Sequence, residues 1–287
     1  MIFLTGAAGK TGHAILAALA KLNAPVKPLV RSEAQAVDIQ KIAKFECVTG
    51  DLRKLANLES QLDGVDIIYF ICPNVAPDEL EIGKNLIQLA KKKNISRFIY
   101  HSVLHPNIES MPHHWQKMRM EEALFASGLN FTILQPCAYM QNILAGWNNI
   151  KAGKYITPYQ TESRLSIVDL NDVAEVAAKV MTQSGFENAI FELAGPENLS
   201  QKEVSQQITQ VIGYPVSAVE QSREDWQKTA LLNGMDPTQV LVLLKMFEYY
   251  DKNGLVGNTT TLGNLLGHSP TRFNQFLERI LQSGEVY

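Results

Sequence analysis

The chain opens with Met1-Ile-Phe-Leu-Thr-Gly6-Ala-Ala-Gly9-Lys-Thr-Gly12, a short apolar strand and a loop with three glycines that runs into a helical Ala/Leu pattern. Gly6 permits a tight turn after the strand, Gly9 leaves no Cβ in the path of a pyrophosphate, and Gly12 lets the helix pack close to the sheet. Phosphates bind readily at such a helix N-terminus, where unpaired N–H groups meet the positive end of the helix dipole. This order of strand, loop and helix predicts a dinucleotide site, with a purely structural turn as the alternative.

Short runs rich in β-branched residues alternate with longer amphipathic runs over the first half of the chain. This alternation is typical of a parallel sheet covered on both faces by helices. We expect strands at 2–5, 26–30, 46–49, 67–72, 97–103 and 131–135, separated by helices near 10–22, 33–43, 54–62, 78–93 and 114–127. The sequence therefore predicts the α/β class, with a doubly wound parallel sheet of the Rossmann type.

The pattern changes after Pro136. We expect a helix at 139–152, a strand at 165–168, a helix at 171–183, a strand at 189–194 and a helix at 200–212, and a largely helical chain from 223 onward. The expected domains are a dinucleotide-binding domain at 1–150, to which the strands near 165–168 and 189–194 contribute, and a smaller, mostly helical lobe on the substrate side at 151–287.

Composition indicates a soluble chain of enzyme size, with 287 residues, 46% of them hydrophobic, and a net charge of −3. Basic residues form no stripe, which argues against direct binding of nucleic acid. No signal peptide or membrane span is recognisable. Cys47, Cys72 and Cys137 are odd in number and widely spaced, so we expect free thiols and a cytoplasmic location. No cluster of Cys, His and carboxylate residues predicts a metal site.

In an open sheet of this type, ligands lie beyond the carboxyl ends of the strands. Arg31 follows the second strand, where an NAD-specific domain usually carries an acidic residue for the ribose 2′-OH. A guanidinium there suits the 2′-phosphate of NADP, and Lys10 would add a second positive charge. The alternative for Arg31 is a solvated surface side chain.

The next two strands end in further candidates for the cofactor site. After the third strand, Asp51 offers a carboxylate to an adenine amino group, and Leu52 follows it. After the fourth strand, Cys72, Pro73 and Asn74 are expected to line the ribose and pyrophosphate with backbone and small side chains.

The fifth strand ends near Ser102, and His113 and Lys117 follow at a spacing that places both on one helix face. Short-chain dehydrogenases have a Ser at this place and a Tyr-x-x-x-Lys pair, but no Tyr-x-x-x-Lys occurs in this chain. Lys117 is the first catalytic candidate, because its ammonium can hold the nicotinamide ribose and stabilise charge on an acceptor; an exposed surface Lys is the alternative. His113 is a candidate acid, although a structural or solvent-facing His is the favoured interpretation.

These motifs resemble the NmrA-like group of atypical short-chain dehydrogenase/reductases. The resemblance covers nearly the whole chain and rests on residues 5–12, 30–32, 50–51, 101–103, 113–117 with Glu121, 134–142, 168–172 and 265–270. Gln135 departs from the group, which commonly has Arg there. The resemblance implies that NAD(P) is bound by the glycine loop, by the cations named above and by a Tyr-x-x-Asn segment, which correspond to Gly6, Ala8, Gly9, Lys10, Thr11, Gly12, Arg31, Lys117, Tyr139, Met140, Gln141 and Asn142.

The group contains two functional kinds. Some members reduce quinones, enones or cationic dyes with NADPH, and others bind the dinucleotide as redox-sensing regulators without turnover. Our first hypothesis is an NADP(H)-dependent reductase of a small-molecule acceptor, with NAD(H) as the second cofactor candidate, and the alternative is the sensor. A homodimer or a regulatory protein partner stays open. A sugar-nucleotide epimerase is disfavoured because that chemistry needs the missing Tyr as a proton relay.

A pocket for an acceptor over the nicotinamide would distinguish a reductase from a redox sensor. We expect such a pocket to be lined by residues 104–112, by the helix at 139–147 and by the C-terminal helices. Its candidate lining residues are Met140, Trp147, Trp226, Met235, Met246 and Phe247. Met and aromatic residues at helical spacing are more often simply core.

Overall fold

The computed structural model describes residues 1–73 and 75–284. Their contacts divide into two compact units that alternate along the chain. The first unit comprises residues 1–107, 113–135 and 173–191, and the second comprises 108–112, 136–172 and the described residues from 192 onward. The domain boundary expected at residue 150 stays a prediction.

The first unit contains a seven-stranded sheet in the order β10-β6-β5-β4-β1-β2-β3. Its strands are β1 (Ile2–Leu4), β2 (Val26–Val30), β3 (Val48–Thr49), β4 (Ile67–Phe70), β5 (Arg97–His101), β6 (Phe131–Pro136) and β10 (Ala189–Leu193). β1 pairs in parallel with β2 on one side and with β4 on the other. The strand order therefore reverses between β1 and β4, which is the point where open α/β sheets bind ligands.

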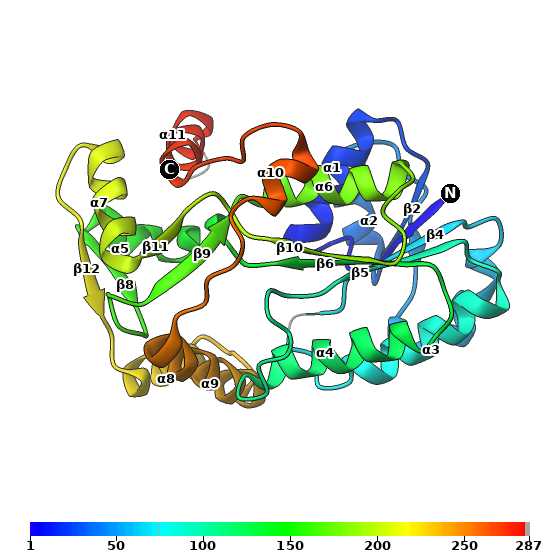
Figure 1. Cartoon of the computed structure of the whole chain (residues 1–287), viewed down its shortest axis with the longest axis horizontal. Coiled ribbons are helices and arrows are strands. Elements are labelled where there is room, and N and C mark those ends of the chain that lie inside the picture. Colours follow the sequence, from blue (N-terminus) through cyan, green and yellow to red (C-terminus); the bar gives the residue numbers. More distant parts are fainter. Residues whose placement is uncertain (74, 285–287) are drawn as a thin grey trace. The chain divides into compact units, whose positions relative to one another are not determined.

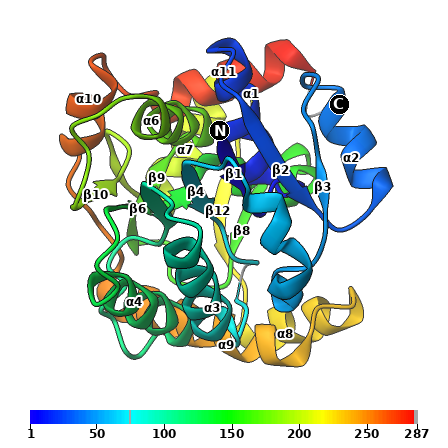
Figure 2. The same cartoon turned by 90° about the vertical axis from the view of Figure 1, so that its right-hand side faces the viewer.

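Helices cover both faces of this sheet. Figure 1 and Figure 2 show α1 (Lys10–Lys21) and α6 (Leu170–Thr182) on one face, and α3 (Glu79–Lys92) and α4 (Pro112–Phe125) on the other. The remaining helices of the unit are α2 (Glu33–Gln40) and the 3-10 segment η1 (Leu52–Leu62). The central strands are rich in apolar residues because both of their faces are buried, as at Phe3, Ile68 and Phe98, which have no exposed surface.

The second unit has its own core between short strands and helices. One small sheet has the order β11-β9-β7 and another pairs β12 with β8. The core joins α7 (Gln201–Ile212) to α11 (Phe273–Ser283) through buried Phe276, Leu277 and Ile208. The other elements are β7 (Ala138–Tyr139), η2 (Met140–Gly146), α5 (Trp147–Lys151), β8 (Lys154–Thr157), β9 (Arg164–Val168), β11 (Asn198–Ser200), β12 (Ser217–Glu220), α8 (Arg223–Leu232), α9 (Pro237–Asn253) and α10 (Thr261–Leu266).

The predicted fold class is confirmed, including the doubly wound sheet and the largely helical C-terminal region. Two local predictions are wrong. The helix expected at 139–152 is instead β7, the 3-10 segment η2 and the short α5, because residues 138–139 pair with β9. The strand near 165–168 does not join the large sheet, since β9 pairs with β11 and β7. Among the described residues, no helix is long and apolar enough to cross a membrane.

Candidate functional site

The glycine loop begins where β1 and β4 end. The buried Thr5 hydroxyl donates to the carbonyl of Ile71 and accepts from the N–H of Ile71, both at 2.9 Å. The N–H of Thr5 also donates to Tyr69 O at 3.1 Å. Thr5 therefore fixes the first residues of the loop against the end of β4, at the point where the strand order reverses.

The three glycines of the loop differ in how much space the structure leaves for a Cβ. Gly6 has a φ of +64°, and a Cβ there would lie 2.8 Å from Cβ of Ile71. A Cβ on Gly12 would lie 2.4 Å from Gly6 O, so the first turn of α1 packs directly on the loop. A Cβ on Gly9 would meet only Gly6 O, at 3.3 Å. Gly6 and Gly12 are therefore required by the loop itself, whereas a Cβ at Gly9 would be limited, among the described residues, by Gly6 O alone.

The start of α1 suits an anion. Its N-cap residue Gly9 has no side chain that could cap the helix, and its first turn contains no acidic residue. Lys10, the first residue of the helix, is exposed, and Ala8 and Thr11 are half-buried. Because the N-terminus of a helix carries partial positive charge, this end favours a phosphate group.

Arg31 follows β2, as predicted, and its backbone is fixed locally. Ser32 caps α2 by accepting from the N–H of Gln35, and the Gln35 side chain accepts from the N–H of Arg31 at 2.8 Å. The side chain of Arg31 is exposed, and within the described part of the chain it has no hydrogen-bond or ion-pair partner. The guanidinium is therefore available to an anionic ligand.

The residues predicted after β3 and β4 to contact the cofactor are in part occupied by contacts within the protein. Asp51 caps η1 by accepting from the N–H of Arg53 at 2.9 Å, and Leu52 packs against the core. Cys72 is buried, and burial raises the pKa of its thiol, whereas Pro73 is exposed. Asn74 lies outside the described residues.

Ser102 lies directly after β5 and belongs to a buried polar group. Its hydroxyl donates to the Glu121 carboxylate, and the Gln135 amide donates to both oxygens of that carboxylate, at 2.9 and 3.0 Å. All three residues are buried. Burial raises the pKa of Glu121. Gln135, the departure from the family pattern, therefore binds Glu121 as a neutral partner where a guanidinium would bring a charge.

Lys117 is paired with a carboxylate that the sequence analysis did not single out. Lys117 Nζ donates to Glu79 Oε1 at 2.8 Å and lies 3.4 Å from His101 O. The hydroxyl of Tyr100 donates to the same Glu79 oxygen at 2.6 Å, and Nζ lies 5.3 Å from the centre of the Tyr100 ring. Glu79 shares the buried face of α3 with Ile82 and Leu86. The sequence did contain a signal for Glu79, namely a carboxylate at a helical position where the spacing calls for an apolar residue.

The histidines near Lys117 are neutral. Burial is the first cause that lowers the pKa of His113 to about 3, that of His101 to about 3 and that of His114 to about 4, and the charge of Lys117 contributes in each case. The ring of His114 faces that of His113 edge-on and bonds His105 O at 3.1 Å. His113 Nδ1 is buried, and no group of the described residues forms a hydrogen bond with it. His114 is thus held by a backbone carbonyl, while one ring nitrogen of His113 has no partner among the described residues.

The predicted segment 139–142 lies in the second unit, where much of it has a structural role. The amide of Gln141 donates to buried Asp169 at 2.6 Å, and its oxygen accepts from the N–H of Leu170. Met140 is buried in the core of this unit. Tyr139 is half-buried, and Asn142 is exposed. The binding role of this segment stays a prediction.

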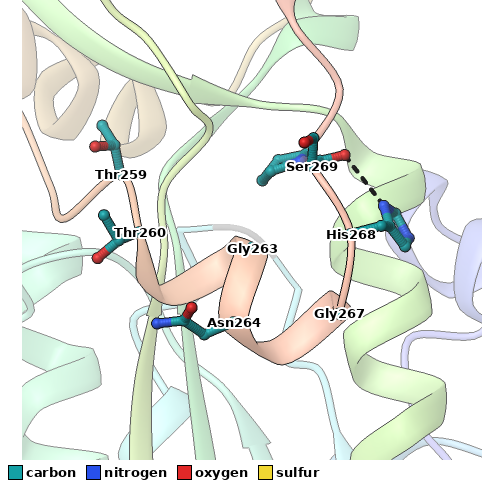
Figure 3. A pocket seen from close by; sticks show the side chains of 8 residues that line it. Thr259, Thr260, Gly263, Asn264, Gly267, His268 and Ser269 are labelled. Carbon is teal, nitrogen blue, oxygen red and sulfur yellow. Dashed lines mark hydrogen bonds between the residues drawn. The ribbon is translucent and has the colours of Figure 1, made fainter.

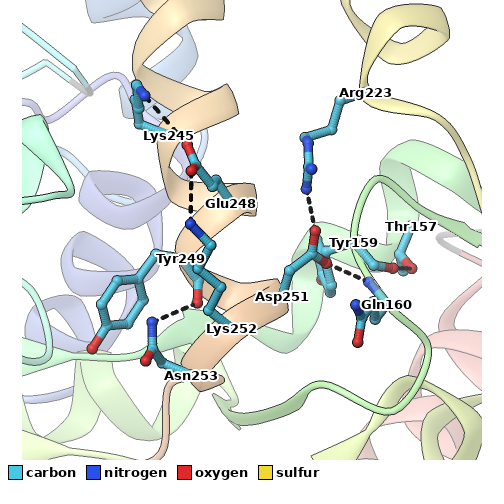
Figure 4. Close-up of polar contacts among 10 residues, drawn as sticks. All are labelled: Thr157, Tyr159, Gln160, Arg223, Lys245, Glu248, Tyr249, Asp251, Lys252 and Asn253. Carbon is cyan, nitrogen blue, oxygen red and sulfur yellow. Dashed lines mark hydrogen bonds and ion pairs between the residues drawn. The ribbon is translucent and has the colours of Figure 1, made fainter.

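Four of the candidate acceptor-lining residues of the second unit have packing contacts within it. Trp147 is buried in the same core as Met140. The rings of Trp226 and Phe247 are nearly perpendicular, 4.7 Å apart. Nearby, Asp251 pairs with Arg223 and accepts from the N–H of Gln160 at 2.7 Å, which links the chain after β8 to α8 and α9 (Figure 4). These contacts support the core interpretation for Trp147 and Met140.

An open depression of about 550 Å³ lies at α10 in the second unit (Figure 3). Its lining is polar and small, and His268 Nδ1 bonds Ser269 O at 3.1 Å beside it. None of the predicted site residues lines it; the residues that do are Thr259, Thr260, Gly263, Asn264, Gly267, His268, Ser269 and Pro270. Among the described residues, no group of three or more His, Cys, Asp or Glu side chains could hold a metal ion.

Several known proteins similar to this chain are oxidoreductases by name. An NAD(P)H azoreductase from Xenophilus azovorans is 27% identical over 279 residues, which is 96% of both chains. Quinone oxidoreductase 2 from Escherichia coli is 26% identical, over 94% of this chain and 95% of that protein. The structure of the Escherichia coli NADPH-dependent quinone oxidoreductase QOR2 with NADPH has a TM-score of 0.86 at 24% identity, over 98% of this chain and 100% of the other, which shows the fold. The model of the NmrA-like family matches residues 1–277. The chain therefore belongs to the NmrA-like family.

Proposed function

We propose that this protein is an NADPH-dependent reductase that transfers hydride to a quinone-type, enone or dye acceptor. The observation that carries the proposal is the space in front of Gly9, where a Cβ would have one protein atom within 4 Å, Gly6 O at 3.3 Å, in a loop whose other two glycines are required by its own packing. A pyrophosphate on the start of α1 needs that space. The relatives named above support the same class of chemistry.

The residues of the first unit fit the parts of this cofactor. The loop from Gly6 to Gly12 would hold the pyrophosphate at the uncapped start of α1. The exposed Arg31 would bind the 2′-phosphate, and Lys117 would bind the nicotinamide ribose through its remaining N–H. When bound, NADPH supplies the hydride.

The side chains around Lys117 favour an acceptor that needs no proton from a strong acid. His101, His113 and His114 are uncharged at neutral pH because their pKa values lie near 3 to 4, and the Ser102 hydroxyl is held by Glu121. None of these groups is a ready proton donor. An unactivated ketone would need such a donor because hydride turns it into a basic alkoxide. A quinone yields a resonance-stabilised anion and a cationic dye is neutralised by hydride, so neither depends on a strong acid.

Oxidation of NADPH by the full chain, with different acceptors, tests this proposal. We expect turnover with a quinone or a triarylmethane cation and negligible turnover with a simple ketone. His113→Ala should cost less activity than Lys117→Ala. Efficient reduction of a ketone that depends on His113 would contradict the assignment. Tight NADPH binding with no turnover for any acceptor would favour the alternative, a redox sensor.

A further inference from the structure

A buried carboxylate holds the Lys117 ammonium. Glu79 is 2% exposed, and its Oε1 accepts from Lys117 Nζ at 2.8 Å and from the Tyr100 hydroxyl at 2.6 Å. The Lys117 side chain is itself only 14% exposed. We call Glu79, Tyr100 and Lys117 the Glu79 cluster.

Stability alone gives little reason for this arrangement. Removing two charges from water costs several kcal/mol per ion, and well-packed apolar residues in place of a buried ion pair are often about as stable. Glu79 lies on the same face of α3 as Ile82 and Leu86, where a hydrophobic side chain would fit the pattern. A carboxylate at this position therefore needs a reason other than packing.

Helical spacing favours a different partner for Lys117. Glu121 lies four residues after Lys117 on α4, the spacing at which such pairs form on a helix. Both oxygens of Glu121 are instead occupied by Gln135, and one also by Ser102. The remaining titratable groups near Lys117 are neutral ones, namely Cys72, His101, His113 and His114. Within the described chain, Glu79 is therefore the carboxylate that sets the position of the ammonium.

We propose that Glu79 is a positioning residue, which holds the Lys117 ammonium where it binds the ribose of NADPH and acts on the cofactor only through Lys117. This inference rests on the proposed function. A free Lys side chain has several rotatable bonds, and fixing it on binding costs affinity. The Glu79 cluster orders the side chain beforehand, so this cost is removed before NADPH arrives.

A double-mutant cycle in the dissociation constant for NADPH tests the proposal. It uses the full chain, with titration calorimetry at a temperature where circular dichroism shows each variant folded. We expect Glu79→Gln and Lys117→Gln each to raise Kd about tenfold, or ~1.4 kcal/mol. The double variant should also bind about tenfold more weakly, and not about a hundredfold as for independent residues. Glu81→Gln, an exposed carboxylate on the same helix, is the matched control and should bind as wild type does.

A wild-type Kd in Glu79→Gln, or a double variant with the product of the two single effects, would overturn the proposal. A wild-type Kd in Lys117→Gln would overturn it as well, while leaving NADPH binding by the protein intact. Wild-type protein without affinity for NADPH would instead refute the proposed function. Where Glu79→Gln does not fold, Glu79→Asp decides, because it keeps the charge but withdraws it by one methylene. A Kd of Glu79→Asp between that of the wild type and that of Lys117→Gln supports positioning, and a Kd equal to that of the wild type contradicts it.

Discussion

Under the proposed function, Arg31 is the residue on which we expect cofactor choice to depend. Arg31 directly follows β2. Its guanidinium is exposed and has no hydrogen-bond or ion-pair partner among the described residues. Each charge-assisted hydrogen bond to a 2′-phosphate contributes roughly 1.5–3 kcal/mol, so we expect NADPH to bind at least about tenfold more tightly than NADH. Arg31→Asp should abolish or invert this preference in titration calorimetry. Arg119→Asp, the same change at an exposed Arg of α4, is the control. Equal affinities of the wild type for both dinucleotides would defeat this assignment.

The buried histidines make stability depend on pH. His101 and His114 have pKa values of about 3 and 4 in the folded chain, below the value of 6.5 expected when unfolded, chiefly because of burial. Their contribution is therefore fully present above pH 6.5 and is lost as the pH falls toward 4, by roughly 1.4 kcal/mol per pH unit for each His. Glu121 and Asp172, whose pKa values burial raises, act in the opposite direction.

Urea unfolding between pH 7.5 and about 5.5 measures this effect. We expect the free energy of unfolding to fall over this interval in the wild type. His114→Asn can retain a donor for His105 O and should show a lower stability with a shallower dependence on pH. An identical slope in wild type and variant would show that His114 does not titrate as its burial implies.

Single residues could be predicted where their role depends on local order along the chain. The glycine loop and Arg31 lie directly after strands, as expected, and their roles in binding stay predictions. Glu79 could not be found in this way, because its partner Lys117 lies 38 residues away and helical spacing points to Glu121. The sequence also could not show that Ser102 is bound by Glu121, since that contact joins the end of β5 to a face of α4.

At the scale of elements, the glycine loop can be tested with a matched pair of substitutions. Gly12→Ala places a Cβ 2.4 to 2.6 Å from three backbone atoms of residues 6 and 7, so we expect a loss of stability of about 1–3 kcal/mol or more. Gly9→Ala is a milder change, because its backbone is extended and its Cβ would crowd one atom, Gly6 O at 3.3 Å, which a shift of a few tenths of an ångström relieves. It should keep a near wild-type melting temperature but bind NADPH at least about tenfold more weakly. Undiminished binding by Gly9→Ala would show that no phosphate approaches there.

The elements that sequence patterns predicted well are those with continuous apolar runs, such as β4, or a strong amphipathic period, such as α3. The helix predicted at 139–152 was wrong because strand pairing at the start of this segment overrides its helical composition. Ala138 and Tyr139 pair with Ile167 and Val168, and the chain turns through η2 before α5 begins at Trp147. Such pairing joins residues about 29 apart and overrides a local preference.

At the scale of the whole chain, the alternation of strands and helices was enough to predict the doubly wound sheet. The interleaving of the two units was predicted only in part: the strand near 189–194 joins the large sheet as expected, whereas the strand near 165–168 does not. Residues 173–191 belong to the first unit although they follow 136–172, which belong to the second. The ordering of such segments is decided by contacts between distant parts of the chain, for which local periodicity carries no signal.

Hydride transfer from NADPH is the central claim, and isotope transfer measures it most directly. The full chain is incubated with a triarylmethane cation or an enone and with NADPH that carries deuterium at one of the two C4 positions of the nicotinamide, each position in turn. The account predicts that mass spectrometry finds one deuterium on a carbon of the reduced acceptor for one of the two positions and none for the other. Tight binding of NADPH without any deuterated product from either label would contradict the reductase assignment.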